Sequence, residues 1–140
     1  MRPATRPICH WPGELGLSPG SGGDGNPLDA WGGGTFVTNL PQALSLLDAS
    51  PDHDIIVFCR DNSDDPAFDT PELVRRYIDL FTRAAAQSRK PHYLLHSRPG
   101  VMDRALVAQL REHDIAVVGG LREGLPAIDR LARLTSRTNS

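Results

Sequence analysis

Short apolar runs alternate with longer stretches of helical periodicity in the part of the chain that follows residue 40. Three segments, 54–60, 92–96 and 115–118, each contain an uninterrupted run of apolar residues. Such runs are typical of strands that are covered on both faces. Because helix-periodic segments and short connections follow the runs, the pattern predicts an α/β fold with a parallel sheet, flanking helices and right-handed crossovers.

Four helices are expected from apolar residues that recur every three or four positions. Their predicted ranges are 41–49, 70–88, 102–113 and 124 onwards. Asn39 is the expected N-cap of the first helix, and Thr70 caps the second, where a proline and an acid follow. Pro126 would lose a hydrogen bond in a helix interior. The last helix is therefore predicted to begin close to Gly124, after a turn over Leu121–Glu123.

The amino-terminal part of the chain differs in composition from the rest. Nine of the thirteen glycines and five of the twelve prolines lie between Met1 and Gly34, among isolated apolar residues. This predicts a disordered leader over 1–25, a folded domain over 26–134 and a disordered tail over 135–140. With 140 residues, of which 39% are hydrophobic, the chain has room for one such domain.

Charge and cysteine content restrict the expected partners and compartment. A formal charge of −2 provides no overall basic excess for binding nucleic acid. Cys9 and Cys59 form neither a disulfide framework nor a thiolate zinc site, which favours a reducing cytoplasm. No stretch approaches the roughly 20 apolar residues of a membrane span. We therefore expect a cytoplasmic protein without nucleic-acid or membrane partners, with Cys59 in the core of its strand.

Three arginines, Arg60, Arg98 and Arg122, each lie at or just after the carboxyl end of a predicted strand. Ligands of open parallel sheets bind beyond these ends, and a guanidinium donates two parallel hydrogen bonds to a phosphate or carboxylate. The three arginines are therefore candidates for a rim that binds an anion or phosphate. The alternative is that they are solvated loop residues, because fourteen of the fifteen basic residues are arginine.

The segment after the first predicted strand is strongly acidic. Five of its twelve residues are acids: Asp61, Asp64, Asp65, Asp69 and Glu72. Their spacing partly matches a calcium loop, but Pro66 stands where the turn glycine belongs and a strand precedes the segment. No metal site is predicted here. A solvated loop and ion pairs with the rim arginines are the two remaining interpretations.

His96 ends the second predicted strand at the same rim. A histidine in this place is a candidate for a proton shuttle or a phosphoryl acceptor. The sequence identifies no acid that would orient the ring, so a polar strand end is the alternative. No other catalytic residue is predicted, and the spacing of the five histidines indicates no metal site.

The most distinctive motif is N-P-L-D-A-W-G-G-G over residues 26–34. It resembles the opening of the CoA-ligase domain, a flavodoxin-like domain of the succinyl-CoA synthetase and ADP-forming acyl-CoA synthetase superfamily. The matching residues are Asn26, Pro27, Asp29, Gly32 and Gly33. Later segments follow the family order, including R-K-P-H-Y-L-L and the closing G-L-R-E-G-L-P.

The resemblance implies a three-layer α/β/α domain with a mainly parallel four-stranded sheet, whose first strand would be Pro27–Ala30. It also implies a part in the reaction of an acid, CoA and ATP to acyl-CoA, ADP and phosphate. The family's ATP-grasp, phosphohistidine and main CoA-binding domains have no counterpart in these 140 residues. CoA and ATP or ADP are therefore implied for the complete enzyme, no cofactor is expected to be bound firmly here, and ATP-grasp and CoA-binding subunits or domains are the expected partners.

Two hypotheses follow. The chain is either a CoA-ligase-type domain, stand-alone or truncated, that is not catalytic by itself, or a non-catalytic flavodoxin-like binding or scaffold module that has lost the family chemistry. The acids of the segment 61–72 should repel a phosphorylated histidine and thereby favour the second hypothesis. A lone enzyme that uses His96 or Cys59 ranks below both.

Overall fold

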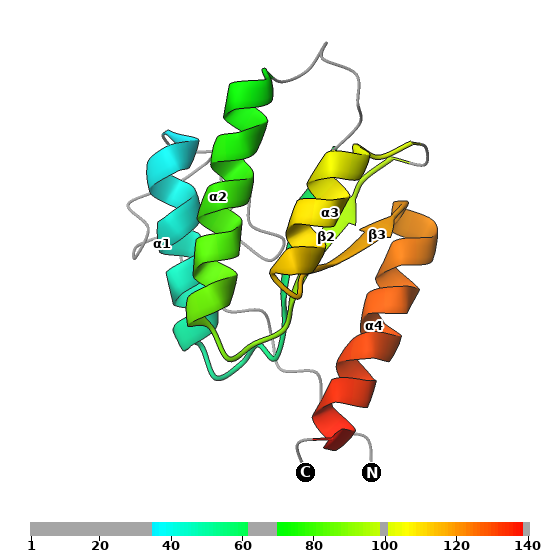
Figure 1. Ribbon diagram of the computed structural model, residues 1–140. Coiled ribbons are helices and arrows are strands. Elements are labelled where there is room, and N and C mark those ends of the chain that lie inside the picture. Colours follow the sequence, from blue (N-terminus) through cyan, green and yellow to red (C-terminus); the bar gives the residue numbers. More distant parts are fainter. Residues whose placement is uncertain (1–34, 62–69, 99–100, 139–140) are drawn as a thin grey trace, which may run out of the picture. The chain divides into compact units, whose positions relative to one another are not determined.

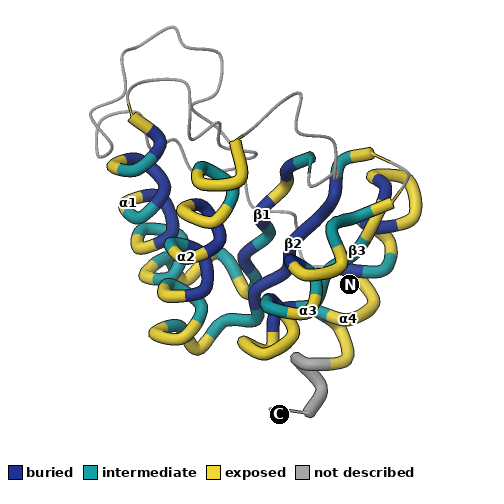
Figure 2. The backbone as a smooth tube through the Cα atoms, turned by 45° about the horizontal axis from the view of Figure 1, so that its top comes forward, coloured by how far each residue is buried: buried dark blue, intermediate teal, exposed yellow. Residues whose placement is uncertain are grey.

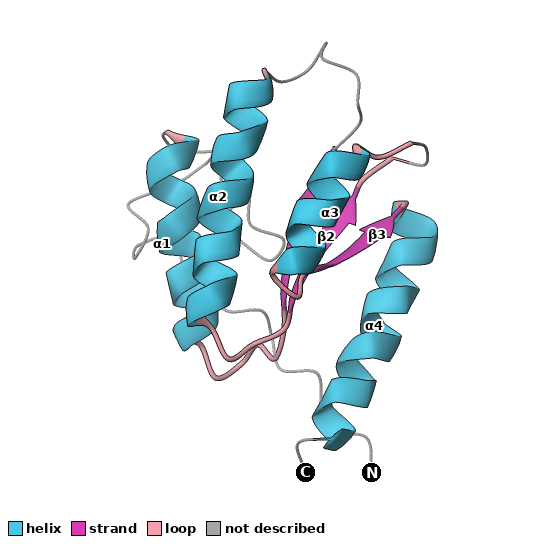
Figure 3. Cartoon of the chain, in the orientation of Figure 1, coloured by secondary structure: helices cyan, strands magenta, loops and turns pink. Residues whose placement is uncertain are grey.

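Helices and strands alternate along the chain in the computed structural model, which describes residues 35–61, 70–98 and 101–138 (Figures 1 and 3). The elements are α1 (Phe36–Ala49), β1 (Ile56–Arg60), α2 (Pro71–Gln87), β2 (His92–His96), α3 (Arg104–Glu112), β3 (Ala116–Gly119) and α4 (Leu121–Thr138). The chain divides into two compact units, 1–43 and 44–140, and the second holds all three strands. None of the described helices is both long and apolar enough to cross a membrane.

The described sheet has three parallel strands in the order β1-β2-β3, so the predicted α/β class and the parallel sheet are confirmed. Ile56 pairs with His92 at one end of the β1–β2 ladder, and Arg60 pairs with His96 at the other. The central strand β2 is buried along its whole length, as Figure 2 shows. Its apolar run is continuous because neither of its faces meets solvent.

Helices cover both faces of the sheet within the unit 44–140. On one face the Phe58 ring of β1 lies 5.2 Å from the Phe81 ring of α2. On the opposite face Tyr93 and Leu95 of β2 form a cluster with Ile128 of α4. The sheet is therefore the middle layer of an α/β/α arrangement, as the resemblance implies.

Several predictions concern residues outside the described ranges. They include the leader 1–25, the fourth strand at Pro27–Ala30, and most of the acidic segment after β1. The family motif residues Asn26, Pro27, Asp29, Gly32 and Gly33 lie there as well. The described sheet has three strands rather than the four that the resemblance implies.

Two helices begin earlier than predicted, because each of them continues through a proline in its first two turns. α1 begins at Phe36 rather than Pro41, with Asn39 inside it instead of at its N-cap, and α4 begins at Leu121 rather than near Gly124. Each proline removes one backbone hydrogen bond, while its neighbours keep theirs. The amide of Asn39 donates to the Thr35 carbonyl at 3.0 Å, and that of Gly124 donates to the Gly120 carbonyl at 2.7 Å. α4 then continues to Thr138.

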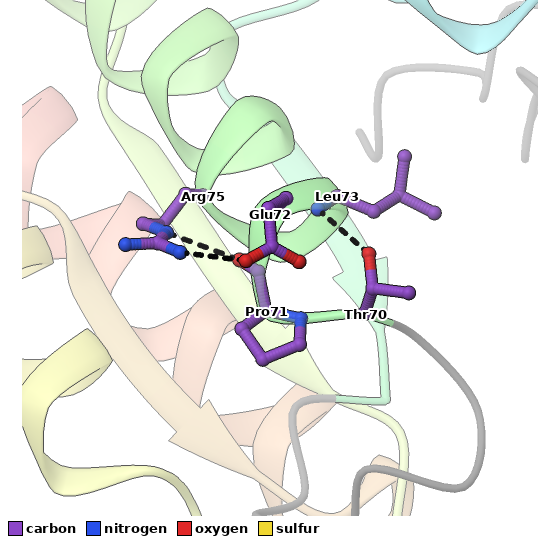
Figure 4. A network of polar contacts seen from close by, with 5 residues as sticks. All are labelled: Thr70, Pro71, Glu72, Leu73 and Arg75. Carbon is purple, nitrogen blue, oxygen red and sulfur yellow. Dashed lines mark hydrogen bonds and ion pairs between the residues drawn. The ribbon is translucent and has the colours of Figure 1, made fainter.

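The start of α2 agrees with the sequence pattern (Figure 4). The Thr70 hydroxyl accepts a hydrogen bond from the Leu73 amide at 3.3 Å, and Pro71 occupies the first turn. Glu72 pairs with Arg75 at 3.1 Å. An N-cap hydroxyl accepts a hydrogen bond from an otherwise unpaired amide, and an acid in the first turn interacts favourably with the positive end of the helix. Local sequence therefore sets this boundary.

Lys90 is the one lysine of the chain, and its side chain caps the carboxyl end of α1. Its ammonium group donates to the carbonyl oxygens of Leu47 and Ser50, at 2.6 Å in each case. Ser88 supports this arrangement, since its hydroxyl donates to the Asp48 carboxylate and accepts from the Lys90 amide. Carbonyls in the last turn of a helix have no partner within the helix. Lys90 therefore supplies a donor that α1 itself lacks.

We expect Lys90→Met to lower the free energy of unfolding by about 2 kcal/mol, because two carbonyls lose a charged donor while the aliphatic stem is retained. Urea unfolding followed by circular dichroism measures the change. Arg89→Met at the exposed neighbouring position is the control and should cost less than about 0.5 kcal/mol. Equal losses in the two variants would contradict the capping role of Lys90.

α4 packs closely on β2 at Gly124. A Cβ atom at this position would lie 2.5 Å from Cδ1 of Leu95, which is itself buried. A real Cβ cannot approach so closely, so Leu95 would have to move within a packed core. Gly119 offers a comparison, because its added Cβ would lie 3.6 Å from Cε of Met102, an ordinary contact.

We expect Gly124→Ala to lower the free energy of unfolding by about 1 kcal/mol. Overpacking costs roughly 1–3 kcal/mol, which outweighs a gain of up to about 1 kcal/mol in helix propensity. Gly119→Ala is the matched control and should be close to neutral in the same urea titration. A Gly124→Ala variant that is as stable as the wild type would show that α4 does not approach β2 as described.

Candidate functional site

The carboxyl ends of β1 and β2 place Arg60 and His96 side by side. The two residues are register partners, and partners in a parallel ladder project from the same face of the sheet. Arg60 is 8% exposed and His96 is 1% exposed. The backbone stays paired at this edge, because the Ser97 amide donates to the Arg60 carbonyl and the Gly120 amide donates to the His96 carbonyl. A buried guanidinium and a buried imidazole thus lie on neighbouring strand ends.

The Arg60 guanidinium is held against α2. Its Cζ lies 4.4 Å from the centroid of the Tyr77 ring, and its Nε donates to the Asp61 carbonyl at 3.2 Å. Tyr77 is almost completely buried. A cation over an aromatic face is stabilised by the ring quadrupole, by about 2 kcal/mol where the pair is desolvated. The direction of Arg60 is therefore fixed by the packing of α2 on β1.

The Asp61 carboxylate lies between His96 and Arg98. Oδ2 forms an ion pair with Nε of Arg98 at 3.0 Å, and Oδ1 lies 3.7 Å from Nδ1 of His96. The Asp61 side chain is 24% exposed and that of Arg98 is 58% exposed, so this contact opens to solvent on the arginine side. An oxyanion is thus already held where the ends of β1 and β2 meet.

The predicted rim residues therefore have different surroundings. Arg60 and Arg98 both contact Asp61, through its carbonyl and its carboxylate respectively. Arg122 is exposed in the first turn of α4, after β3.

Asp61 is the acid near His96 that the sequence did not reveal. It follows the strand residue that pairs with His96, and only the register of β1 on β2 identifies the two as neighbours.

The prediction that Cys59 lies in the core is wrong. Cys59 is exposed, while Phe58 and Arg60 on either side of it are buried. Successive side chains of a strand point to opposite faces, and β1 is an outer strand of the described sheet. Partial burial of the thiol still raises the pKa of Cys59 above its ordinary value.

Among the described residues, no group of three or more histidines, cysteines or acids could hold a metal ion.

No family model matches this chain, and neither the curated proteins nor the solved structures contain a significant match to it. The resemblance to the CoA-ligase domain therefore depends on the sequence motifs alone.

His92 lies at the opposite end of β2 from His96, and its ring is buried in the protein. Its ring lies 5.4 Å from that of Phe81, and its Nδ1 lies 2.8 Å from the Lys90 carbonyl oxygen. Within the part of the chain that the structure describes, the buried Nε2 atom has no hydrogen-bond partner. Burial lowers the pKa of His92 below its ordinary value, because the charged ring would lose its hydration.

This lowered pKa predicts how stability depends on pH. In the unfolded chain the pKa of His92 has its ordinary value of about 6.5, so on acidification the unfolded chain takes up a proton before the folded chain does. Stability is therefore fully present above about pH 6.5 and falls as the pH drops towards the folded pKa. His92→Leu should reduce this slope in urea titrations at a series of pH values. His113→Gln, at an exposed position, should keep it; the same slope in the wild type and His92→Leu would contradict the prediction.

Proposed function

We propose that the chain is a CoA-ligase-type domain of an ADP-forming acyl-CoA synthetase, and that it acts together with chains or domains that supply ATP-grasp and CoA binding. The complete enzyme would convert an acid, CoA and ATP into acyl-CoA, ADP and phosphate. The observation that supports this proposal is the closing G-L-R-E-G-L motif, which lies at the carboxyl edge beside β2. Gly120 has a φ of +76°, which favours glycine, and Gly124 lies against Leu95.

The flavodoxin-like sheet of four strands belongs to the same proposal. In the flavodoxin-like order the first strand lies between the second and the third, which correspond here to β1 and β2. These two strands pair directly with each other. A fourth strand would therefore have to add at an edge of the sheet, which departs from the family order.

The second candidate is a non-catalytic binding or scaffold module that keeps the α/β architecture without the family chemistry. The pairing of Arg98 with Asp61 supports this candidate, since this rim arginine already holds a carboxylate of its own chain. Under this proposal the carboxyl edge binds a ligand or partner, and no bond is made or broken there.

Affinity capture distinguishes the two candidates. The tagged full chain is incubated with a native lysate of the organism that encodes it, and captured proteins are identified by mass spectrometry against a tag-only control. The first candidate predicts capture of ATP-grasp and CoA-binding chains, and acyl-CoA synthesis only when they are combined with this chain. Acyl-CoA synthesis by the purified chain alone would contradict it. Failure to capture either class would favour the second candidate.

A further inference from the structure

We propose that the carboxyl edge of β1 and β2 is an exchangeable oxyanion site, in which the Asp61 carboxylate occupies the place that a phosphate group takes when a ligand binds. The proposal develops the anion-binding rim that the sequence predicts, and it requires neither a partner chain nor acyl-CoA chemistry. Asp61 acts in it as a built-in competitor that the ligand displaces.

The geometry around Asp61 is that of a bound oxyanion. One carboxylate oxygen forms an ion pair of 3.0 Å with Nε of Arg98, and the other lies 3.7 Å from a ring nitrogen of His96. A guanidinium beside a carboxylate is a common way in which proteins recognise an oxyanion. Asp61 therefore marks the position of the site and shows that an oxyanion can be accommodated there.

The charge of these side chains favours a ligand that is more negative than a carboxylate. Arg60 and Arg98 carry two positive charges against the single negative charge of Asp61. Arg60 is already ordered by Tyr77 before any ligand arrives. Ordering it therefore costs little on binding, and it strengthens the field at the place of the Asp61 carboxylate.

A phosphate group suits this exchange better than a carboxylate. A tethered group competes at an effective concentration of the order of millimolar, so a free monocarboxylate with the same charge gains nothing over Asp61. A phosphate ester carries about −1.5 to −2 charges and three acceptor oxygens. It can engage the fork of Arg98 and the His96 ring together, which gives it an advantage over the tethered acid.

The test is calorimetric titration of inorganic phosphate and of CoA into the full chain at about pH 8, above the phosphate pKa of about 6. We expect Asp61→Asn to tighten phosphate binding about tenfold, because the internal competitor is removed, and Arg98→Gln to weaken it about tenfold. The Arg98 side chain is largely exposed, so its replacement leaves the fold intact.

Asp129→Asn is the matched control. Asp129 pairs with Arg133 at 2.9 Å on the exposed side of α4, so this variant makes the same change in charge and also releases an arginine. It should leave the affinity for phosphate unchanged. If Asp61→Asn binds no more tightly than Asp129→Asn, or if Arg98→Gln binds as well as the wild type, the proposal is overturned and any binding is adventitious.

The two ligands identify the source of the phosphate. An Arg98-dependent affinity for CoA that exceeds the affinity for inorganic phosphate would support the site as one for a phosphate group of a larger cofactor. Dependence on Arg98 with inorganic phosphate alone would support a site for the free anion. Because the titrations use only this chain, they can fail while ATP-grasp chains are still captured, and they can succeed when capture fails.

Discussion

The burial of β2 is the constraint on which the rest of the described structure depends. β2 is paired on both sides and covered on both faces, so all five of its residues are buried, including the histidines at its two ends. Burying a polar group without a partner is costly. The two ends meet this cost differently, because His92 packs against Phe81 with one ring nitrogen near a carbonyl, whereas His96 lies against Asp61.

The same constraint produces the candidate site. The register of β1 on β2 sets Arg60 beside His96, and α2, which covers this face, supplies the Tyr77 ring that holds the guanidinium. Asp61 and Arg98 follow directly after the two strands and meet at the edge. Cationic side chains are thus gathered by backbone pairing at the edge where parallel sheets bind ligands. Function at this edge then depends on whether an incoming anion can replace Asp61.

Features that depend on local sequence were predictable, and those that depend on neighbouring elements were not. The strands followed from their continuous apolar runs, and the start of α2 followed from the hydroxyl of Thr70. The starts of α1 and α4 were missed, because the loss of one hydrogen bond at a proline is small beside the bonds that the rest of a helix keeps. The exposure of Cys59 and the contact of Asp61 with His96 depend on strand order and register, which no single segment contains.

Exchange at the oxyanion position between Arg98 and His96 requires that a ligand displace the Asp61 carboxylate. Crystal structures of the full chain grown with and without saturating phosphate test it most directly. In the phosphate-bound crystal we expect the Asp61 carboxylate to have left Nε of Arg98 and phosphate oxygens to lie in its place beside His96. An Asp61 carboxylate still on Arg98, with phosphate bound elsewhere or not at all, would contradict it.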